Sequence, residues 1–296
     1  MRVFITGATG FIGSAIIPEL VAAGHQVVGL ARSEAAAKSL DAIGAQVHRG
    51  SLEDLESLRS GAAAADGVIH CAFNHDFSQY QNNCESDRRV IESMGSALIG
   101  SDRPFVVSGG VGVSTPGRAA TEDDACVPSS MLPRSASEEA ALSLAERGVR
   151  ASMMRLPQVH NLEMQGLITL LVAIAREKRV SAYVGDGTNR WPAAHRLDVA
   201  RLYKLALEKG TAGARYHAIA EEGVPLRQIA EVIGRRLNLP IVSKSPEEAA
   251  DHFGWMGFMV GRDGPASSAL TQERLGWHPL QPGLIADLEH AHNLEV

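Results

Sequence analysis

Three glycines near the N-terminus stand at positions 7, 10 and 13, within the stretch Thr-Gly-Ala-Thr-Gly-Phe-Ile-Gly. An apolar run suited to a strand precedes them and an amphipathic run suited to a helix follows, the context in which this spacing predicts a phosphate-binding turn. Gly7 allows a tight turn, Gly10 lets the backbone approach a ligand closely, and Gly13 lets the helix pack against the strand. The helix N-terminus then presents N–H groups to phosphates. A turn without a ligand is the alternative. The residues expected to hold a dinucleotide pyrophosphate are Gly7, Thr9, Gly10, Phe11, Ile12 and Gly13.

The residues after the second apolar run indicate which dinucleotide is bound. A carboxylate there would hold the 2′-hydroxyl of the NAD ribose, and a basic side chain would hold the 2′-phosphate of NADP. The sequence reads Ala31-Arg32-Ser33, without a carboxylate. An arginine can bind a phosphate with two N–H groups and stack on adenine. We therefore predict NADP(H) as the cofactor, held by Arg32 and Ser33, with a solvated surface arginine as the alternative.

Later strand ends supply further cofactor contacts, because ligands of open α/β sheets bind beyond the carboxyl ends of the strands. Ser51 and Leu52, after the third apolar run, are expected beside the adenine. Cys71, Ala72 and Phe73, after the fourth, are expected near the ribose and pyrophosphate. No sequence neighbour of Cys71 would lower the pKa of its thiol, so we expect this cysteine to fill space rather than react.

Short apolar runs alternate with longer amphipathic segments through the first half of the chain. Strands are expected at residues 2–6, 26–30, 45–48, 67–71, 104–108 and 150–154, and helices at 11–23, 34–42, 53–60, 78–100 and 135–147. This order predicts an α/β protein with a doubly wound parallel sheet, a Rossmann fold, and a smaller C-terminal substrate lobe. We place the NADP-binding domain at residues 1–160, with 195–210 packing back on it, and the substrate-binding lobe mainly in 161–296.

The composition indicates which classes of partner and ligand the protein is expected to bind. The net charge of -6 and the pI near 6.0 come without a basic stripe, so nucleic acid is not an expected partner. The cysteines lack the spacing of a disulfide framework or zinc site and the histidines are scattered, so no metal is expected. No stretch approaches the ~20 apolar residues of a spanning helix, and the N-terminal run is too short for a signal peptide. We expect a soluble, cytoplasmic protein with a small-molecule substrate and no membrane partner.

Further motifs accompany the glycine turn: Val68-Ile69-His70-Cys71-Ala72, Arg155-Leu156-Pro157-Gln158-Val159-His160, His195-Arg196-Leu197-Asp198-Val199-Ala200 and Leu275-Gly276-Trp277-His278-Pro279. With these motifs the chain resembles, nearly end to end, the extended and atypical branch of the short-chain dehydrogenase/reductase superfamily, the NAD-dependent epimerase/dehydratase-like proteins. The resemblance implies that residues 155–160 border the nicotinamide. It adds three expected cofactor contacts, Leu156, Gln158 and Val159.

The resemblance also implies a catalytic Ser or Thr, a Tyr that exchanges a proton, and a Lys that lowers the pKa of that Tyr. Arg134 and Glu138 occupy the places of the YxxxK tyrosine and lysine, and Gly110 occupies the commonest place of the serine, so only Ser108 keeps a hydroxyl there. An arginine stays charged at neutral pH, so Arg134 can orient or stabilise an anion but cannot replace tyrosine as an acid or base. The candidate catalytic residues are therefore Ser108 and Arg134, and we expect Glu138 merely to begin a helix.

Three functions remain open. The first is an NADP(H)-dependent oxidoreductase that transfers hydride to a small carbonyl or conjugated substrate without the Tyr/Lys pair. Its proton would come from water or a pocket residue, and Arg134 could clamp a carboxylate or oxyanion. The second is a non-catalytic NADP(H)-binding regulator or redox sensor. The third is an isomerase similar to sugar-nucleotide epimerases and dehydratases.

Aromatic and histidine side chains of the C-terminal lobe complete the set of candidates. A substrate pocket could take Phe73, Tyr183, Trp191, Phe253, Trp255 and Phe258, although a core position is the better expectation for Trp191. The candidate proton sources are His75, Tyr183, His160 and His195, each of which could equally be structural. Proteins of the resembled superfamily often pair through the helices expected at 78–100 and 135–147, but the first is unusually polar here, so monomer and homodimer both remain open.

Overall fold

The computed structural model describes residues 1–113 and 115–294. Its centre is a seven-stranded parallel sheet in the order β10-β6-β5-β4-β1-β2-β3. Its strands are β1 (Arg2–Thr6), β2 (Gln26–Ala31), β3 (Gln46–Arg49), β4 (Gly67–His70), β5 (Pro104–Gly110), β6 (Arg150–Leu156) and β10 (Arg215–His217). The chain runs outward from β1 to β3 and then crosses to β4, so its direction reverses between β1 and β4. The doubly wound sheet is confirmed, and β10 is an additional strand that the sequence did not indicate.

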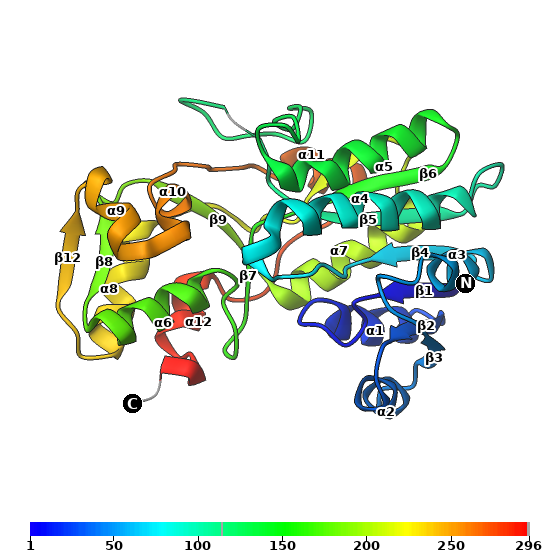
Figure 1. Ribbon diagram of the computed structural model, residues 1–296, viewed down its shortest axis with the longest axis horizontal. Helices are drawn as coiled ribbons and strands as arrows, with labels where there is room; N and C mark the ends of the chain where they lie inside the picture. Colours follow the sequence, from blue (N-terminus) through cyan, green and yellow to red (C-terminus); the bar gives the residue numbers. More distant parts are fainter. Residues whose placement is uncertain (114, 295–296) are drawn as a thin grey trace.

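Helices cover both faces of this sheet (Figure 1). One face carries α1 (Gly13–Ala22), α2 (Glu34–Ala42) and α7 (Arg196–Lys209), and the other carries α3 (Leu55–Ala63), α4 (Tyr80–Ser96) and α5 (Ala136–Glu146). Successive strand residues point to opposite faces, so Val3 and Ile5 of β1 pack with the first group and Phe4 packs with the second. Burial on both faces explains why the strands read as continuous apolar runs.

The helix expected at 11–23 begins two residues later, at Gly13, because the preceding residues still belong to the turn. The Gly10 backbone nitrogen donates to the Gly7 carbonyl oxygen at 2.9 Å. The helix expected at 78–100 is also shorter. It starts with the 3-10 turn η1 (Phe77–Gln79), which the Asp76 side chain caps by accepting from the Ser78 nitrogen, and its α-helical part ends at Ser96.

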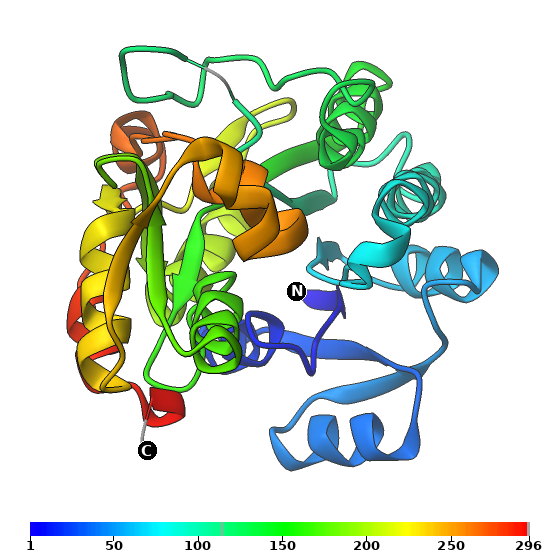
Figure 2. The same cartoon turned by 60° about the vertical axis from the view of Figure 1, so that its left-hand side comes forward.

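The second half of the chain adds two small sheets, β11-β9-β7 and β12-β8. Their strands are β7 (Gln158–His160), β8 (Ser181–Val184), β9 (Arg190–His195), β11 (Glu221–Pro225) and β12 (Ile241–Lys244). The helices are α6 (Ile168–Lys178), α8 (Leu226–Arg236), α9 (Pro246–Phe253), η3 (Gly254–Met256), α10 (Gly257–Val260), α11 (Ala269–Leu275) and α12 (Leu284–Glu289). Most of these elements share one core, which includes Trp191 as expected. Figures 1 and 2 show this lobe beyond the carboxyl ends of β1 and β4.

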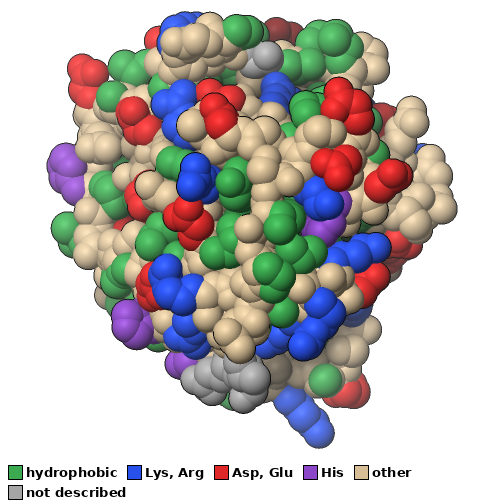
Figure 3. All heavy atoms as spheres, turned by 90° about the vertical axis from the view of Figure 1, so that its left-hand side faces the viewer, with side chains coloured by type: hydrophobic (Ala, Val, Ile, Leu, Met, Phe, Trp, Pro, Cys, Tyr) green, Lys and Arg blue, Asp and Glu red, His purple; other side chains and the backbone are tan. Residues whose placement is uncertain are grey.

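The outer end of the lobe carries charged side chains of both signs scattered among hydrophobic ones (Figure 3). Within residues 1–113 and 115–294, no group of three or more His, Cys, Asp and Glu side chains is placed to hold a metal ion. The same residues contain no helix with the length and apolar character needed to cross a membrane.

Candidate active site

The glycine turn connects β1 to α1 beside the segment that follows β4. Gly7 has a φ of +68°, and a Cβ atom there would stand 2.7 Å from the backbone nitrogen of Ala72. A Cβ atom on Gly13 would stand 2.2 Å from the carbonyl oxygen of Gly7. Side chains are therefore excluded at both positions, because the turn packs closely against the segment after β4 and the start of α1 packs closely against the turn. No side chain caps the N-terminus of α1, and the Ser14 backbone nitrogen donates to the Gly10 carbonyl oxygen at 3.0 Å, so the positive end of the helix dipole points at the turn. This cradle fits the pyrophosphate of a dinucleotide.

The other residues of the turn form its open side. Thr9 and Gly10 are exposed, whereas Phe11 and Ile12 are half-buried against the core under α1. Cys71 also packs against that core, and burial raises the pKa of its thiol to about 11. A thiol with so high a pKa is protonated at neutral pH, which agrees with a space-filling role.

The residues expected to meet the adenosine lie after the neighbouring strands β2 and β3. Arg32 is exposed directly after β2, and the Ser33 hydroxyl caps α2 by accepting from the Ala36 nitrogen at 3.2 Å. Ser51 and Leu52 are half-buried beyond β3. Glu53, which was not among the residues expected at this site, has a lowered pKa, chiefly through a hydrogen bond with Ser51 and in part through the charge of Arg32. A carboxylate therefore stands within electrostatic reach of Arg32.

Arg134 lies in the 3-10 turn η2 (Pro133–Ser135), immediately before α5. Its Nη1 donates to Asp87 Oδ2 at 2.9 Å and also contacts the Ser137 hydroxyl, while Nη2 donates to the Ser108 carbonyl oxygen at 3.0 Å. The guanidinium lies 4.2 Å from the centre of the Phe73 ring. These contacts fix Arg134 at the carboxyl ends of β4 and β5, next to the point where the direction of the sheet reverses.

A buried chain of hydrogen bonds runs from Arg134 to the glycine turn. Asp87 Oδ1 lies 2.9 Å from His70 Nε2, and His70 Nδ1 lies 2.6 Å from Thr6 Oγ1. All three side chains are buried. Burial disfavours the charged form of Asp87 and by itself would raise the pKa of its carboxyl. The interactions with His70 and Arg134 have a larger effect and hold this pKa below its usual value. Asp87 could not be predicted from the sequence, because one aspartate in a polar helical segment does not reveal its partners.

The Ser108 side chain points away from Arg134, to the face of the sheet that α7 covers. Its hydroxyl donates to the His70 carbonyl oxygen at 2.5 Å and lies 2.6 Å from the Tyr203 hydroxyl. Burial raises the pKa of Tyr203 well above its usual value, so both hydroxyls are neutral and internally bonded. Only the backbone carbonyl of Ser108 reaches Arg134. A Cβ atom on Gly110, where the resemblance predicts the family serine, would meet no heavy atom within 4 Å.

The expectation that Glu138 merely begins a helix is wrong. Its carboxylate is buried and accepts from Arg155 Nε at 2.8 Å, Arg155 Nη2 at 2.6 Å and Arg215 Nε at 2.7 Å. Burial disfavours the charged form of Glu138, but the two guanidinium groups stabilise that form and hold the pKa of the Glu138 carboxyl below its usual value. The first turn of α5 packs on β6 and β10, which bring these arginines to it. Glu138 is thus part of a buried ionic cluster.

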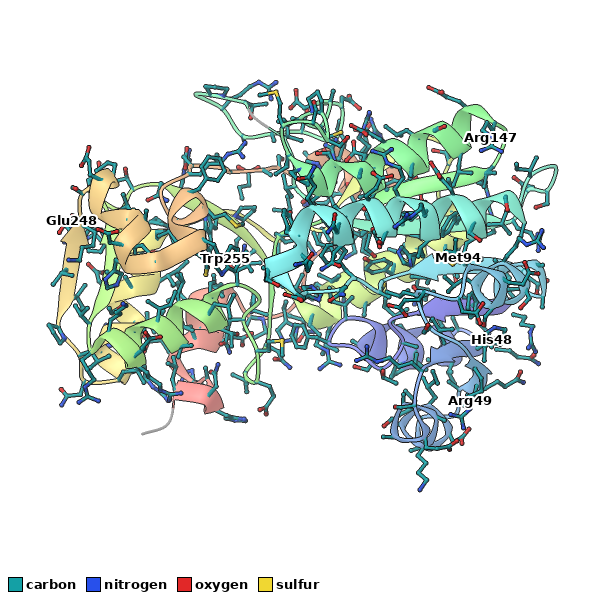
Figure 4. All side chains as sticks on the ribbon, in the orientation of Figure 1. His48, Arg49, Met94, Arg147, Glu248 and Trp255 are labelled. Atoms are coloured by element: carbon teal, nitrogen blue, oxygen red, sulfur yellow. The ribbon has the colours of Figure 1, made fainter. Side chains whose placement is uncertain are left out.

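Aromatic side chains beyond β4 connect the two parts of the molecule. Phe77 of η1 stacks on Trp255 of η3, with ring centres 4.4 Å apart and planes inclined by 21°. Phe77 also contacts Tyr80 and His75, and both of those contact Phe73. Figure 4 shows Trp255 between the α9–α10 segment and the beginning of α4. Phe73 and Trp255 from the expected pocket therefore belong to one aromatic cluster, which starts at Arg134.

Other expected pocket residues lie elsewhere. Tyr183 lies under the guanidinium of Arg227, 5.6 Å from it, Phe253 is buried in the core of the lobe, and Phe258 is 77% exposed. Two of the candidate proton sources have structural partners: His160 Nδ1 lies 2.7 Å from Asp287 Oδ2, and His195 Nδ1 accepts from the Leu197 nitrogen to cap α7. Burial lowers the pKa of both histidines.

The expected nicotinamide contacts follow β6. Leu156 packs against the core under α1, Val159 is buried in that core, and the Gln158 side chain accepts from the Leu167 nitrogen at 3.0 Å. Gln158 thereby ties this strand to the segment that begins α6.

The sequence model of the NAD dependent epimerase/dehydratase family matches residues 3–220, and the chain belongs to this family. An uncharacterized protein of Schizosaccharomyces pombe is 50% identical over 290 residues, which cover 97% of this chain and 98% of that protein. A sterol-4-alpha-carboxylate 3-dehydrogenase (decarboxylating) of Dictyostelium discoideum is 28% identical over 243 residues, which cover 77% and 74% of the two chains. The name of the family and the name of this last relative point to epimerases, dehydratases and oxidoreductases.

A solved structure with the same fold is that of the dTDP-glucose 4,6-dehydratase DesIV from Streptomyces venezuelae, with NAD and TYD bound. It aligns with a TM-score of 0.78 and 19% identity over 99% of this chain and 96% of that one. The superfamily suggested by the motifs is thus confirmed, and family membership together with the glycine cradle supports a nicotinamide dinucleotide as cofactor.

Proposed function

We propose that this protein is an NADP(H)-dependent oxidoreductase that reduces a carbonyl group, or a double bond conjugated to one, in a small molecule. The observation that carries the proposal is the guanidinium of Arg134, held by Asp87 and the Ser108 carbonyl at the carboxyl ends of β4 and β5. Family membership and the oxidoreductase relative support hydride chemistry at this site.

Different residues of the chain would bind the cofactor and stabilise the product. The glycine turn would hold the cofactor pyrophosphate and Arg32 the 2′-phosphate, and the bound cofactor would supply a hydride. Hydride addition to a carbonyl carbon leaves a negative charge on the oxygen, which a fixed guanidinium stabilises. No described residue accepts a hydrogen bond from Nε of Arg134, so this donor remains for the substrate. Arginine does not give up its proton, so the proton that completes the product comes from water.

His75 and Tyr80 are the titratable neighbours of this site. Burial raises the pKa of Tyr80 to about 12, and burial together with the charge of Arg134 lowers the pKa of His75. Both side chains are therefore uncharged near neutral pH. They can orient a substrate by hydrogen bonding, but neither has the pKa of an efficient proton donor.

The preference for NADP(H) is tested by titrating NADPH and NADH against wild type and Arg32→Ala by calorimetry. Loss of a charge-assisted phosphate contact is expected to weaken NADPH binding by about 10- to 100-fold and to leave NADH binding unchanged. Arg49→Ala is the control, because Arg49 is also exposed near this edge but pairs with Glu34. Equal affinity of the wild type for both cofactors would refute the phosphate assignment.

The reaction is tested by following NADPH oxidation with ketones, enals, quinones and imines, using wild type and Arg134→Ala. We expect turnover with a subset of these compounds and a loss of about 100-fold or more in kcat/KM for Arg134→Ala, the size of effect seen when one oxyanion donor is removed. Arg118→Ala, at an exposed arginine paired with Asp124, should retain wild-type activity. Equal activity of Arg134→Ala and wild type would overturn the proposed role of Arg134.

A non-catalytic NADP(H)-binding regulator is the second candidate. It is favoured by the ion pair with Asp87, which offsets the charge of Arg134. It is also favoured by Arg134 and Glu138, which stand where the resemblance predicts the Tyr/Lys pair. Tight NADPH binding without turnover of any compound would support it. Nucleotide sugars belong in the same panel, because their interconversion would instead identify an isomerase.

A further inference from the structure

Arg196, the first residue of α7, lies against the glycine turn although it is distant in sequence. Its Nη2 donates to Ser14 Oγ at 2.8 Å, and Ser14 Oγ donates in turn to the Gly10 carbonyl oxygen at 2.7 Å. The centre of the guanidinium lies 4.9 Å from the centre of the Phe11 ring. Arg196 thus contacts the first turn of α1 from the neighbouring helix.

Two other cations of α7 have carboxylate partners. Arg201 pairs with Asp198 at 2.6 Å, and Lys204 pairs with Glu19 at 3.5 Å. Arg196 forms no ion pair with any described residue, and its Nε is buried without a hydrogen-bond partner. Burial lowers the pKa of its guanidinium with no acidic group opposing it. Since a guanidinium stays charged, this is a partly buried cation without a counter-ion, which costs free energy.

The surroundings of Arg196 add to the positive potential. The N-terminus of α1 has no side-chain cap, and α7 begins beside it at Arg196 itself. Two helix N-termini therefore meet here, and each carries a partial positive charge. His195 caps α7 through its Nδ1 and brings no negative charge. An anion at this place would find a guanidinium and two helix dipoles.

We infer that Arg196 binds the pyrophosphate of the dinucleotide cofactor and is the positive charge that the glycine turn lacks. Nη1 donates to no described residue and is not among the buried unpartnered atoms, so it is the donor left for this contact, while Ser14 and Phe11 hold the guanidinium toward the turn. The inference rests on the proposed dinucleotide binding and goes beyond it, because it assigns pyrophosphate and 2′-phosphate recognition to different arginines. Arg196 would strengthen binding of NADPH and NADH alike, whereas Arg32 would distinguish them.

The test is calorimetric titration of wild type, Arg196→Met and Arg196→Lys with NADPH, NADH and adenosine 2′-monophosphate, which has no pyrophosphate. Methionine keeps an apolar stem against Phe11 without the charge. We expect the Arg196→Met protein to bind NADPH and NADH more weakly than wild type by the same factor, about 10- to 100-fold. Its affinity for adenosine 2′-monophosphate should equal that of the wild type. Arg196→Lys, which keeps a charge without the planar fork, should lose less affinity.

Lys204→Met is the matched control, because it removes a cation of the same helix that already has a partner, and it should bind all three ligands like wild type. Thermal unfolding of the ligand-free proteins checks the fold, and Arg196→Met should melt no lower than wild type because it removes an unpaired charge. Unchanged NADPH and NADH affinities would overturn the inference, as would an equal loss for adenosine 2′-monophosphate. A wild-type protein that binds neither dinucleotide would instead refute the proposed function itself.

Discussion

The glycine turn and the Arg134 cluster lie at the same edge of the sheet, but they are assembled in opposite ways. The turn is built from residues 7–13, and its shape requires glycines, because a side chain at Gly7 or Gly13 would collide with neighbouring backbone atoms. The cluster joins Phe73, Asp87, Ser108 and Arg134, which come from separate elements, and its shape depends on the charges and hydrogen bonds between them. The first region can thus be recognised from spacing alone, whereas the second exists only after folding has brought distant residues together.

The largest expected effect is on the buried ion pairs of Glu138. Glu138→Gln leaves Arg155 and Arg215 without a carboxylate in a buried place, and we expect a loss of about 3–5 kcal/mol in the free energy of unfolding. Chemical denaturation measures it. Glu139→Gln is the control in the same helical turn, where the carboxylate pairs with Arg88 but is 33% exposed, and about 1 kcal/mol is expected. Equal losses for the two variants would mean that the Glu138 cluster does not stabilise the fold.

Asp87 makes the Arg134 cluster sensitive to acid. Its pKa is lowered in the folded protein, so its charge adds stability above the unfolded pKa of about 4, and that stability is lost as the pH falls through the folded pKa. Asp87→Asn should cost about 2–3 kcal/mol at neutral pH, and the difference from wild type should shrink below about pH 4. Denaturation at several pH values measures this. A difference independent of pH would contradict a charged Asp87.

Substitutions at two glycines test whether close packing defines the glycine turn. Gly13→Ala forces a Cβ atom into the Gly7 carbonyl, so α1 must shift, and we expect a loss of about 1–3 kcal/mol in stability together with weaker dinucleotide binding. Gly110→Ala places its methyl group in open space and should change stability by less than about 0.5 kcal/mol. Thermal unfolding and NADPH titration measure both. Equal behaviour of the two variants would show that close packing does not define the turn.

The smallest expected effect concerns the lobe. Trp255→Ala removes the stack on Phe77, and because Trp255 is 52% exposed we expect a loss of only about 1 kcal/mol in stability. If the aromatic cluster borders the substrate, KM should rise by about 2- to 10-fold with little change in kcat. Phe258→Ala, on the same segment and 77% exposed, is the control and should change neither. An unchanged KM for Trp255→Ala would remove the cluster from the substrate site.

These contrasts explain what the sequence could predict. The strands and the glycine turn follow from local patterns, and the period of two in β5 even puts Val106 and Ser108 on one face. No local pattern says that α7 covers that face with Tyr203, so the direction of the Ser108 hydroxyl could not be foreseen. Glu138 and Arg215 are 77 residues apart. Their pairing depends on β10, which was too short to be recognised.

The pH profile of kcat/KM for carbonyl reduction by the wild type tests the central claim most directly. Arg134 keeps its charge, Tyr80 titrates at about 12 and the pKa of His75 is lowered, so the profile should be flat between about pH 7 and pH 10. A tyrosine-based acid would instead make the rate fall as its hydroxyl ionises in that range. A tenfold fall per pH unit within this window would contradict an active site in which a permanently charged arginine stabilises the product oxyanion.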